Sequence, residues 1–299
     1  MIKFYFSLLM VVFIVLKCDA QIIDADRNPY SKEPFFNPEF ILSENIKSIT
    51  GAFHYKRDNE KMYDKGIIVK YEFDCNGRLE RLYNTFKKYG GETDTLFVFY
   101  EYDSIGRLNV KRTTDNFGFY SINYSYNESG NIFQETYSRE LNANSYSGQF
   151  ILSKQYAMGV EKFEFTYVSP VYYTKKLLNS LGLPFKEISY LMNENGKLIE
   201  ETGTFLSIRH VERKKYIYND NGKLSESNES SDLGQNSTIH YIYAYDQKDQ
   251  LIEIKKLKNE EPVKVTEFML NEKGFLTNAL SRDIAGKIID VTKFSYEFY

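Results

Sequence analysis

One nine-residue pattern recurs along the chain and limits its possible folds more than any other feature. Two aromatic residues separated by one position are followed by Asp or Asn, and Gly, a basic residue and Leu complete the pattern. The clearest copies are Tyr71–Leu79, Tyr100–Leu108 and Tyr216–Leu224. Most neighbouring copies start 24 to 29 residues apart, a spacing that indicates a repeat protein. Further copies begin at Tyr124, Tyr190, Tyr243 and Phe268.

Each position of the pattern has a mechanical role in a β-hairpin. The two aromatic side chains lie on one face of a strand, because successive side chains alternate between faces. Asp or Asn opens a turn by accepting backbone hydrogen bonds, and the Gly three residues later supplies the left-handed conformation that closes it. The basic residue begins the return strand with its charge in water, and Leu turns back toward the aromatic face. Each copy therefore predicts one hairpin.

The long interval between Tyr124 and Tyr190 predicts an irregular part of the array. A weak copy without a recognisable turn begins at Phe163, 27 residues before Tyr190. It leaves an insertion of about a dozen residues near 138–148. The role of the segment 124–163 stays open. We also expect a short helix near 175–182.

Neighbouring hairpins must pair edge to edge, because a single hairpin is only marginally stable in water. About eighteen to twenty strands cannot remain in one flat sheet, so a curled strip, a sandwich and a barrel-like closure are all open. We expect an all-β fold of tandem antiparallel β-hairpins forming an extended, twisted and curled sheet, a partial shell or spiral. The expected organisation is a signal peptide at 1–20, an N-terminal linker or cap at 21–45 and the hairpin array at 46–299.

The first residues have the layout of an export signal. Lys3 is followed by an apolar stretch at 4–16 and by a small-residue cleavage site at 18–20, which predicts removal of the signal before Gln21. A membrane-spanning helix needs about 20 apolar residues, so this stretch is too short. We therefore expect an exported protein that resides in the periplasm, on the cell surface or outside the cell.

The cysteines, the hydropathy and the net charge restrict how the chain can be anchored, cross-linked and bound. Lys17 stands before Cys18, where a lipoprotein signal has a small residue, so a lipid anchor at Cys18 is disfavoured. Once the signal is removed, Cys75 is a lone thiol and cannot form an internal disulfide. No later segment is apolar enough for a membrane span in the mature chain. The formal charge of -3 gives no reason to expect nucleic acid as a partner.

The pattern in Tyr100–Leu108 resembles the tyrosine-aspartate repeat, also called the YD or Rhs-type repeat, and the resemblance covers about 71–299. It implies hairpins that wind into a spiralling shell, as in large secreted or surface bacterial proteins and animal teneurins. A carbohydrate-binding role has been attributed to some members. The chain departs from the pattern where Asp249 replaces the turn Gly and where Met192 and Leu270 replace the second aromatic residue.

No group of residues has the arrangement of an active site. His54, His210 and His240 lack metal-ligand spacing, and Cys75 lies at a variable turn position without a paired His. The repeated carboxylates are replaced by Asn in sister copies, which indicates a role in turns, because Asn cannot exchange protons as a carboxylate does. We therefore predict no catalytic residue, no cofactor site and no metal site. The carboxylates considered are Asp74, Asp103 and Asp246, and the Asn replacements are at 127, 193, 219 and 271.

Two functions from different classes remain, with an enzyme as an outsider. The first is a non-enzymatic structural or interaction module of the cell envelope or extracellular space, with an unknown protein or glycan as its partner. The second is a carbohydrate-binding module that uses exposed tyrosines. The chain has 26 Tyr and 23 Phe but no Trp, and the missing Trp weakens the second hypothesis although Tyr rings can also stack. Glycosylation-type tripeptides occur at Asn123, Asn228 and Asn236.

Overall fold

The computed structural model describes residues 21–23, 36–115, 118–143, 151–233 and 237–299. The signal predicted at 1–20 lies outside the described residues. One short helix, α1 (Pro38–Ser43), precedes the strands. In chain order the strands are β1 (Ile46–Arg57), β2 (Tyr63–Phe73), β3 (Leu79–Lys87), β4 (Thr93–Tyr102), β5 (Leu108–Asp115), β6 (Gly118–Tyr126), β7 (Ile132–Asn142), β8 (Leu152–Ser169), β9 (Tyr172–Leu178), β10 (Pro184–Met192), β11 (Leu198–Phe205), β12 (Val211–Tyr218), β13 (Leu224–Ser231), β14 (Thr238–Tyr245), β15 (Leu251–Lys258), β16 (Glu261–Leu270), β17 (Leu276–Asp283) and β18 (Ile288–Phe298).

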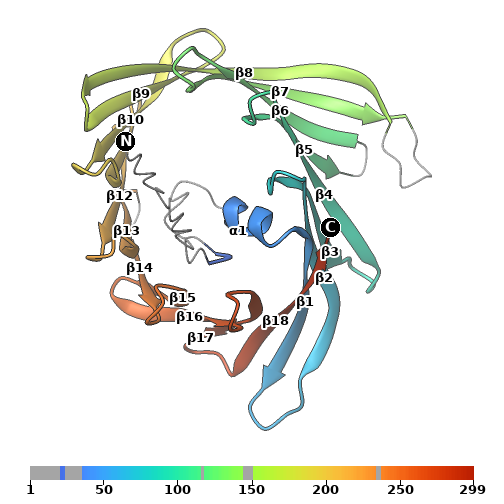
Figure 1. The fold of residues 1–299 in the computed structure, drawn as a ribbon. Helices are drawn as coiled ribbons and strands as arrows, with labels where there is room; N and C mark the ends of the chain where they lie inside the picture. The colour runs from blue at the N-terminus through green and yellow to red at the C-terminus, as the bar shows by residue number, and fades with distance from the viewer. Residues whose placement is uncertain (1–20, 24–35, 116–117, 144–150, 234–236) are drawn as a thin grey trace, which may run out of the picture.

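The strands form a closed antiparallel barrel. Each strand pairs with the next along the chain, and β18 pairs with β1 to complete an 18-stranded sheet. Ile49 on β1 marks the closure, because it is opposite Tyr71 of β2 on one side and Tyr296 of β18 on the other. The strands accordingly form a ring in the view along the barrel (Figure 1).

The expectation of an open, curled strip, a partial shell or spiral, is wrong. The strand that closes the ring is β1, which precedes the first copy of the repeat and carries no copy itself. It joins the two free edges of the hairpin array, and closure removes the unpaired backbone groups that any open edge exposes. The all-β fold and the tandem hairpins are confirmed.

The repeat forms the hairpin turns that the pattern predicts. Gly77, Gly106 and Gly222 have φ angles of 76°, 88° and 76°, in the left-handed region. At the position where the pattern loses its glycine, Asp249 takes a φ of 57°. In each hairpin of the repeat the register shifts next to the turn, as between Glu72 and Phe73, which is the bulge expected beside a three-residue loop.

Two local expectations need correction or extension. The helix expected near 175–182 is absent, because β9 and a turn at 179–182 occupy this segment, and β9 pairs on both sides with β8 and β10. The turn repeats the capping of the motif, since the Asn179 side chain accepts from the backbone of Leu181 and Leu183. The insertion near 138–148 corresponds to the hairpin of β7 and the long strand β8, and its residues 144–150 lie outside the described residues.

The aromatic pairs of the repeat face the inside of the barrel. Phe40 and Ile41 of α1 belong to the same buried cluster as Tyr71 and Phe73 of β2, and α1 lies within the ring of strands (Figure 1). Because side chains alternate along a strand, Lys70 and the other residues one position away from these aromatics face outward. We call the two sides of the wall the inner face and the outer face.

Ion pairs are spread around the outer face. Lys70 lies 3.2 Å from Glu297 of β18, and Arg213 of β12 lies 3.2 Å from Glu200 of β11. Similar contacts join Arg112 to Glu140, His240 to Glu226 and Arg282 to Glu267. The outer face therefore carries charged side chains on strands from every part of the barrel. Among the described residues, none of the helices has the length and apolar character needed to cross a membrane.

Candidate functional site

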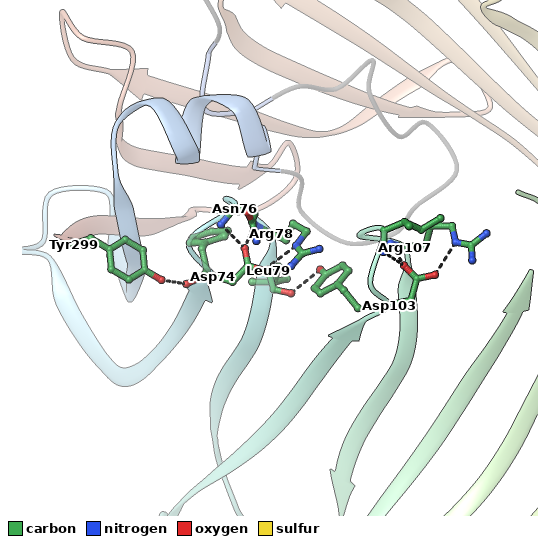
Figure 2. Close-up of polar contacts among 10 residues, drawn as sticks. Asp74, Asn76, Arg78, Leu79, Asp103, Arg107 and Tyr299 are labelled. Atoms are coloured by element: carbon green, nitrogen blue, oxygen red, sulfur yellow. Dashed lines mark hydrogen bonds and ion pairs between the residues drawn. The ribbon is translucent and has the colours of Figure 1, made fainter.

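The repeated Asp residues hold the hairpin turns together. Oδ1 of Asp74 accepts hydrogen bonds from the backbone amides of Asn76 and Arg78, both at 2.9 Å, and Oδ2 accepts from Nε of Arg78 at 2.8 Å. Asp103 makes the equivalent bonds to Arg107, at 2.8 Å to the backbone amide and 2.8 Å to Nε (Figure 2). One carboxylate thus caps the turn and fixes the first residue of the return strand.

These contacts lower the pKa of Asp74. Burial by itself would raise it, but the hydrogen bonds from the Arg78 side chain and from the two backbone amides outweigh that effect. The pKa of Asp103 is lowered by the same balance of causes. Both carboxylates are therefore ionised at neutral pH and have their oxygens occupied by the turn, which leaves them poorly suited to proton transfer.

The basic residue of each turn also joins one hairpin to the next. The guanidinium of Arg78 lies 4.5 Å from the ring centre of Tyr102, and that of Arg107 lies 4.3 Å from Tyr126. The expectation that this charge would lie in water is wrong, because Arg78 is held between its own Asp and the tyrosine of the following repeat.

The second aromatic residue of the pattern supplies another link. The hydroxyl of Tyr102 donates to the backbone carbonyl of Leu79, the last residue of the preceding copy, at 2.7 Å. The final residue, Tyr299, donates in the same way to the carbonyl of Phe73 at 2.5 Å (Figure 2). The Tyr and Leu of the pattern therefore join neighbouring hairpins wherever the second aromatic residue is a tyrosine. The same bond joins Tyr126 to Leu108, Tyr218 to Leu198, Tyr245 to Leu224 and Tyr296 to Leu276.

The three histidines occupy separate structural positions. His54 Nδ1 lies 3.1 Å from the carbonyl of Ala52, and His240 pairs with Glu226 on the outer face. His210 is buried, contacts Asp232 through Nδ1 and stacks on the ring of Phe205. In the ranges that the structure describes, no three His, Cys, Asp or Glu side chains are grouped as metal ligands would be.

The remaining candidates from the sequence lie apart from one another. Cys75 is an exposed, free thiol in the turn after β2. Asn123 is on β6 and Asn228 is on β13, both at outward positions of the wall, whereas Asn236 lies outside the described residues. The described members of this group, Cys75, Asn123 and Asn228, lie on different hairpins.

A row of stacked tyrosines on the inner face is the first candidate binding surface. The ring centres of Tyr167 and Tyr173 are 5.4 Å apart, and those of Tyr173 and Tyr190 are 4.7 Å apart with their planes within 19°. The residues come from β8, β9 and β10 and are directly opposite one another in the ladders. Tyr167 is 58% exposed, so the end of the row is open to ligands.

Two oppositely charged side chains flank this row. Glu201 is opposite Tyr190 in the ladder, and burial raises its pKa although Lys214 and Lys186 act in the other direction. Burial lowers the pKa of Lys175, whose ammonium lies 3.7 Å from the ring centre of Phe163. The row therefore offers flat rings together with a hydrogen-bond acceptor and a donor.

The nine-residue pattern did not identify this surface. Only Tyr190 belongs to a recognised copy, whereas Tyr167 and Tyr173 lie on either side of a turn that lacks the Asp and Gly. The available signal was the alternation of Phe163, Phe165 and Tyr167, which places three aromatic rings on one face of a strand.

A hollow on the outer face lies over β3 to β6. It has a volume of about 580 Å³ and is lined by Phe97, Phe99, Phe119 and Arg112, with Ile151 at its margin. Arg112 is held there by Glu140, whose side chain is only 5% exposed. Because both partners are largely buried, this ion pair braces the wall.

Comparisons with known proteins leave the family open. No family model matches the chain, and no curated protein matches it. Among solved structures it is similar to a porin-like protein from Bacteroides uniformis, with 12% identity, 85% of this chain and 97% of that chain covered, and a TM-score of 0.41. A porin-like protein from Bacteroides vulgatus shares 10% identity over 84% and 98% of the two chains, with a TM-score of 0.36. A chain of the TcdB2-TccC3 complex shares 12% identity over 73% of this chain and 16% of that chain, with a TM-score of 0.21.

Proposed function

We propose that this chain is an exported, non-enzymatic interaction module of the bacterial cell envelope or extracellular space, built from YD-type repeats. The observation that carries the proposal is the use of the repeated polar residues. Asp74, Arg78 and Tyr102 are all engaged in holding hairpins to one another. A motif whose Asp, Arg and Tyr side chains hold the hairpins together serves as a scaffold, and binding then falls to residues between the copies.

The mature barrel faces water on its outside and does not span a membrane. The distribution of charge on the outer face supports this part of the proposal. Ion pairs such as Lys70 with Glu297 and Arg213 with Glu200 lie on outward positions of the strands. A strand in a membrane instead presents apolar side chains to lipid, and an Arg or Lys at mid-membrane costs about 2–4 kcal/mol. Residues 21–299 should therefore stay monodisperse without detergent in size-exclusion chromatography. A requirement for detergent would contradict this part of the proposal.

A second candidate function is carbohydrate binding at the inner tyrosine row. Sugar rings present C–H groups that pack on aromatic faces, and their hydroxyls bond to carboxylates and ammonium groups. Tyr167, Tyr173 and Tyr190 supply such faces in a line, with Glu201 and Lys175 beside them. This line of rings favours an extended glycan over a single sugar.

A glycan array with residues 21–299 distinguishes the two functions. If the tyrosine row binds glycans, Tyr167→Ala should abolish the signals, because it removes the exposed end of the row. Tyr156→Ala is the matched control, since Tyr156 is on the same strand and 50% exposed but lies outside the row. Equal loss in both variants, or no glycan signal at all, would reject the carbohydrate hypothesis.

Identifying a binding partner tests the proposal that the barrel is an interaction module. A pull-down from the cell envelope with the intact barrel should recover a specific protein or glycan, and recovery should fall when the barrel is unfolded by urea. Turnover of any substrate by the purified barrel would contradict the non-enzymatic role.

A further inference from the structure

A pocket on the inner face lies far from the tyrosine row, among the strands next to the closure of the barrel. It is formed by β1, β2 and β16 to β18, which follow one another along the lower part of the ring (Figure 1). Tyr55 and Asp290 are opposite each other in the ladder of β1 and β18. They share the inward side of their strands with Phe53 and Phe294, which pack against the buried cluster around α1. The pocket has a volume of about 450 Å³.

The pocket gathers positive charge in a chain whose net charge is -3. Its lining includes Arg57, Lys65, Lys264 and Lys287, against the carboxylates of Asp283 and Asp290. One of those carboxylates is already used, because Asp290 lies 2.7 Å from Nζ of Lys65. The balance of charge in the pocket is therefore positive.

Three of the cations lack a carboxylate partner. Among the described residues, no carboxylate oxygen lies within the 4.0 Å salt-bridge distance of Arg57, Lys264 or Lys287. Lys264 is also directly opposite Lys256 in the ladder of β15 and β16. Like charges opposite each other destabilise a pair of strands, so an anion bound here would relieve a repulsion that is built into the wall.

We propose that this pocket binds a tetrahedral oxyanion, the phosphate or sulfate group of a small molecule. The cations come from β1, from β16 and from the turn between β17 and β18, so their donors approach from several directions. A tetrahedral group with three or four acceptor oxygens uses such donors better than a planar carboxylate does. The guanidinium of Arg57 can bind two oxygens at once, and the lysines act as point charges.

The rest of the pocket fits the remainder of such a molecule. The guanidinium of Arg57 lies 5.9 Å from the ring centre of Tyr55, and that ring stacks on Tyr63 at 5.3 Å. The paired rings supply a flat apolar wall beside the charged one. This site does not depend on the tyrosine row, so it can exist whether or not the barrel binds a neutral glycan.

Calorimetric titration of residues 21–299 with inorganic phosphate, inorganic sulfate and acetate, at equal ionic strength in chloride, tests the proposal. Phosphate and sulfate should bind saturably and more tightly than acetate. Lys264→Gln should weaken binding about tenfold, as expected for one charge-assisted hydrogen bond. Lys293→Gln is the matched control, because it removes the same charge from an outward position of β18 and should leave the affinity within about twofold.

Titration with a phosphorylated and with a sulfated monosaccharide identifies the source of the anion. The natural ligand resembles the monosaccharide that binds more tightly than the corresponding free ion. Arg57→Gln provides a second variant if Lys264→Gln disturbs folding, and far-ultraviolet circular dichroism checks both. The proposal is overturned if neither oxyanion binds saturably, if acetate binds as tightly as phosphate, or if Lys264→Gln and Lys293→Gln behave alike.

Discussion

The inner face of the barrel differs between the strands that close the ring and the strands opposite them. Around β1, β2, β17 and β18, α1 covers the wall and helps to bury ten residues in one cluster. Around β8 to β13, the cluster of buried residues that the structure describes has only three members, Leu198, Tyr216 and Leu224. The hairpins are alike in both places, so among the described residues the difference lies in α1, which belongs to the first cluster and not to the second. We call the first region covered and the second uncovered, according to the presence of α1.

The comparison separates stability from binding. The covered region excludes water from Phe73, Phe275 and their neighbours, and burial of apolar surface is the main source of folding free energy. In the uncovered region Tyr167 is exposed, and Lys175 and Glu201 are half-buried beside the tyrosine row. We expect substitutions in the first region to change the free energy of unfolding and those in the second to change binding.

The largest difference should follow truncation of an aromatic residue in each region. Phe275 is 6% exposed and packs edge-on against Phe40 at 5.3 Å and Tyr296 at 5.1 Å. Phe275→Ala should lower the free energy of unfolding by about 3–5 kcal/mol, because it leaves a cavity in the cluster. Tyr173→Ala, in the uncovered region, should cost about 1–2 kcal/mol. Urea denaturation measures both, and equal losses would contradict the division of the inner face.

Replacing a turn glycine by alanine in each region compares the two regions at positions with the same backbone conformation. Gly77 and Gly196 have φ angles of 76° and 74°, so alanine is strained at either position. A Cβ on Gly77 would lie 2.4 Å from the backbone oxygen of Pro38, at the start of α1, whereas a Cβ on Gly196 meets nothing within 4 Å.

Gly196→Ala should therefore cost about 1 kcal/mol, and Gly77→Ala about 2–4 kcal/mol, because only the second change displaces α1. Thermal and urea unfolding of the two variants give the difference. Identical costs would mean that α1 does not press on this turn.

Acid should weaken the turns of the two regions unequally. The turn after β2 is capped by Asp74, whose pKa is lowered, whereas the turn after β12 is capped by Asn219. A carboxylate with a lowered pKa in the folded state contributes stability above its unfolded pKa, and this contribution is lost as the pH falls through the folded value. The window therefore lies below the ordinary Asp pKa of about 3.9.

Amide hydrogen exchange can follow this effect in each turn. Protection of the Arg78 amide, which donates to Asp74, should fall in acid relative to protection of the Lys223 amide, which donates to Asn219. Asp74→Asn should remove the difference, and Asp74→Ala should cost about 1–2 kcal/mol at neutral pH because the cap itself is lost. Parallel changes at both amides would show that the carboxylate does not control its turn.

The hairpins were predictable because Gly77 and Asp74 act within a few residues of each other. Closure of the barrel was not predictable, because it depends on the pairing of Ile49 with Tyr296 from the other end of the chain. No local pattern encodes that contact. The tyrosine row was not predicted for a related reason: Tyr173 lies in a copy of the pattern that has lost its turn residues. The oxyanion pocket collects cations from positions as distant as 57 and 287, which only the closed ring brings together.

The smallest expected change in stability comes from neutralising one carboxylate, compared between the inner face and the outer face. Burial raises the pKa of Glu201 on the inner face, so its contribution to stability is fully present below the unfolded pKa and is lost as the pH rises through the folded value. At neutral pH the ionised group therefore opposes folding. Glu201→Gln should raise the free energy of unfolding by up to about 1 kcal/mol at pH 7, and the gain should shrink below pH of about 4.

Glu200 provides the control, because it faces outward and lies 3.2 Å from Arg213. Glu200→Gln should give no gain, since it removes an ion pair exposed to water. A residue that opposes folding at neutral pH, yet lies beside a row of accessible aromatic rings, is placed for a ligand. If Glu201→Gln stabilises the barrel and also weakens binding at the tyrosine row, the uncovered region holds its charge for recognition; a stabilised variant with unchanged binding would limit recognition to the rings.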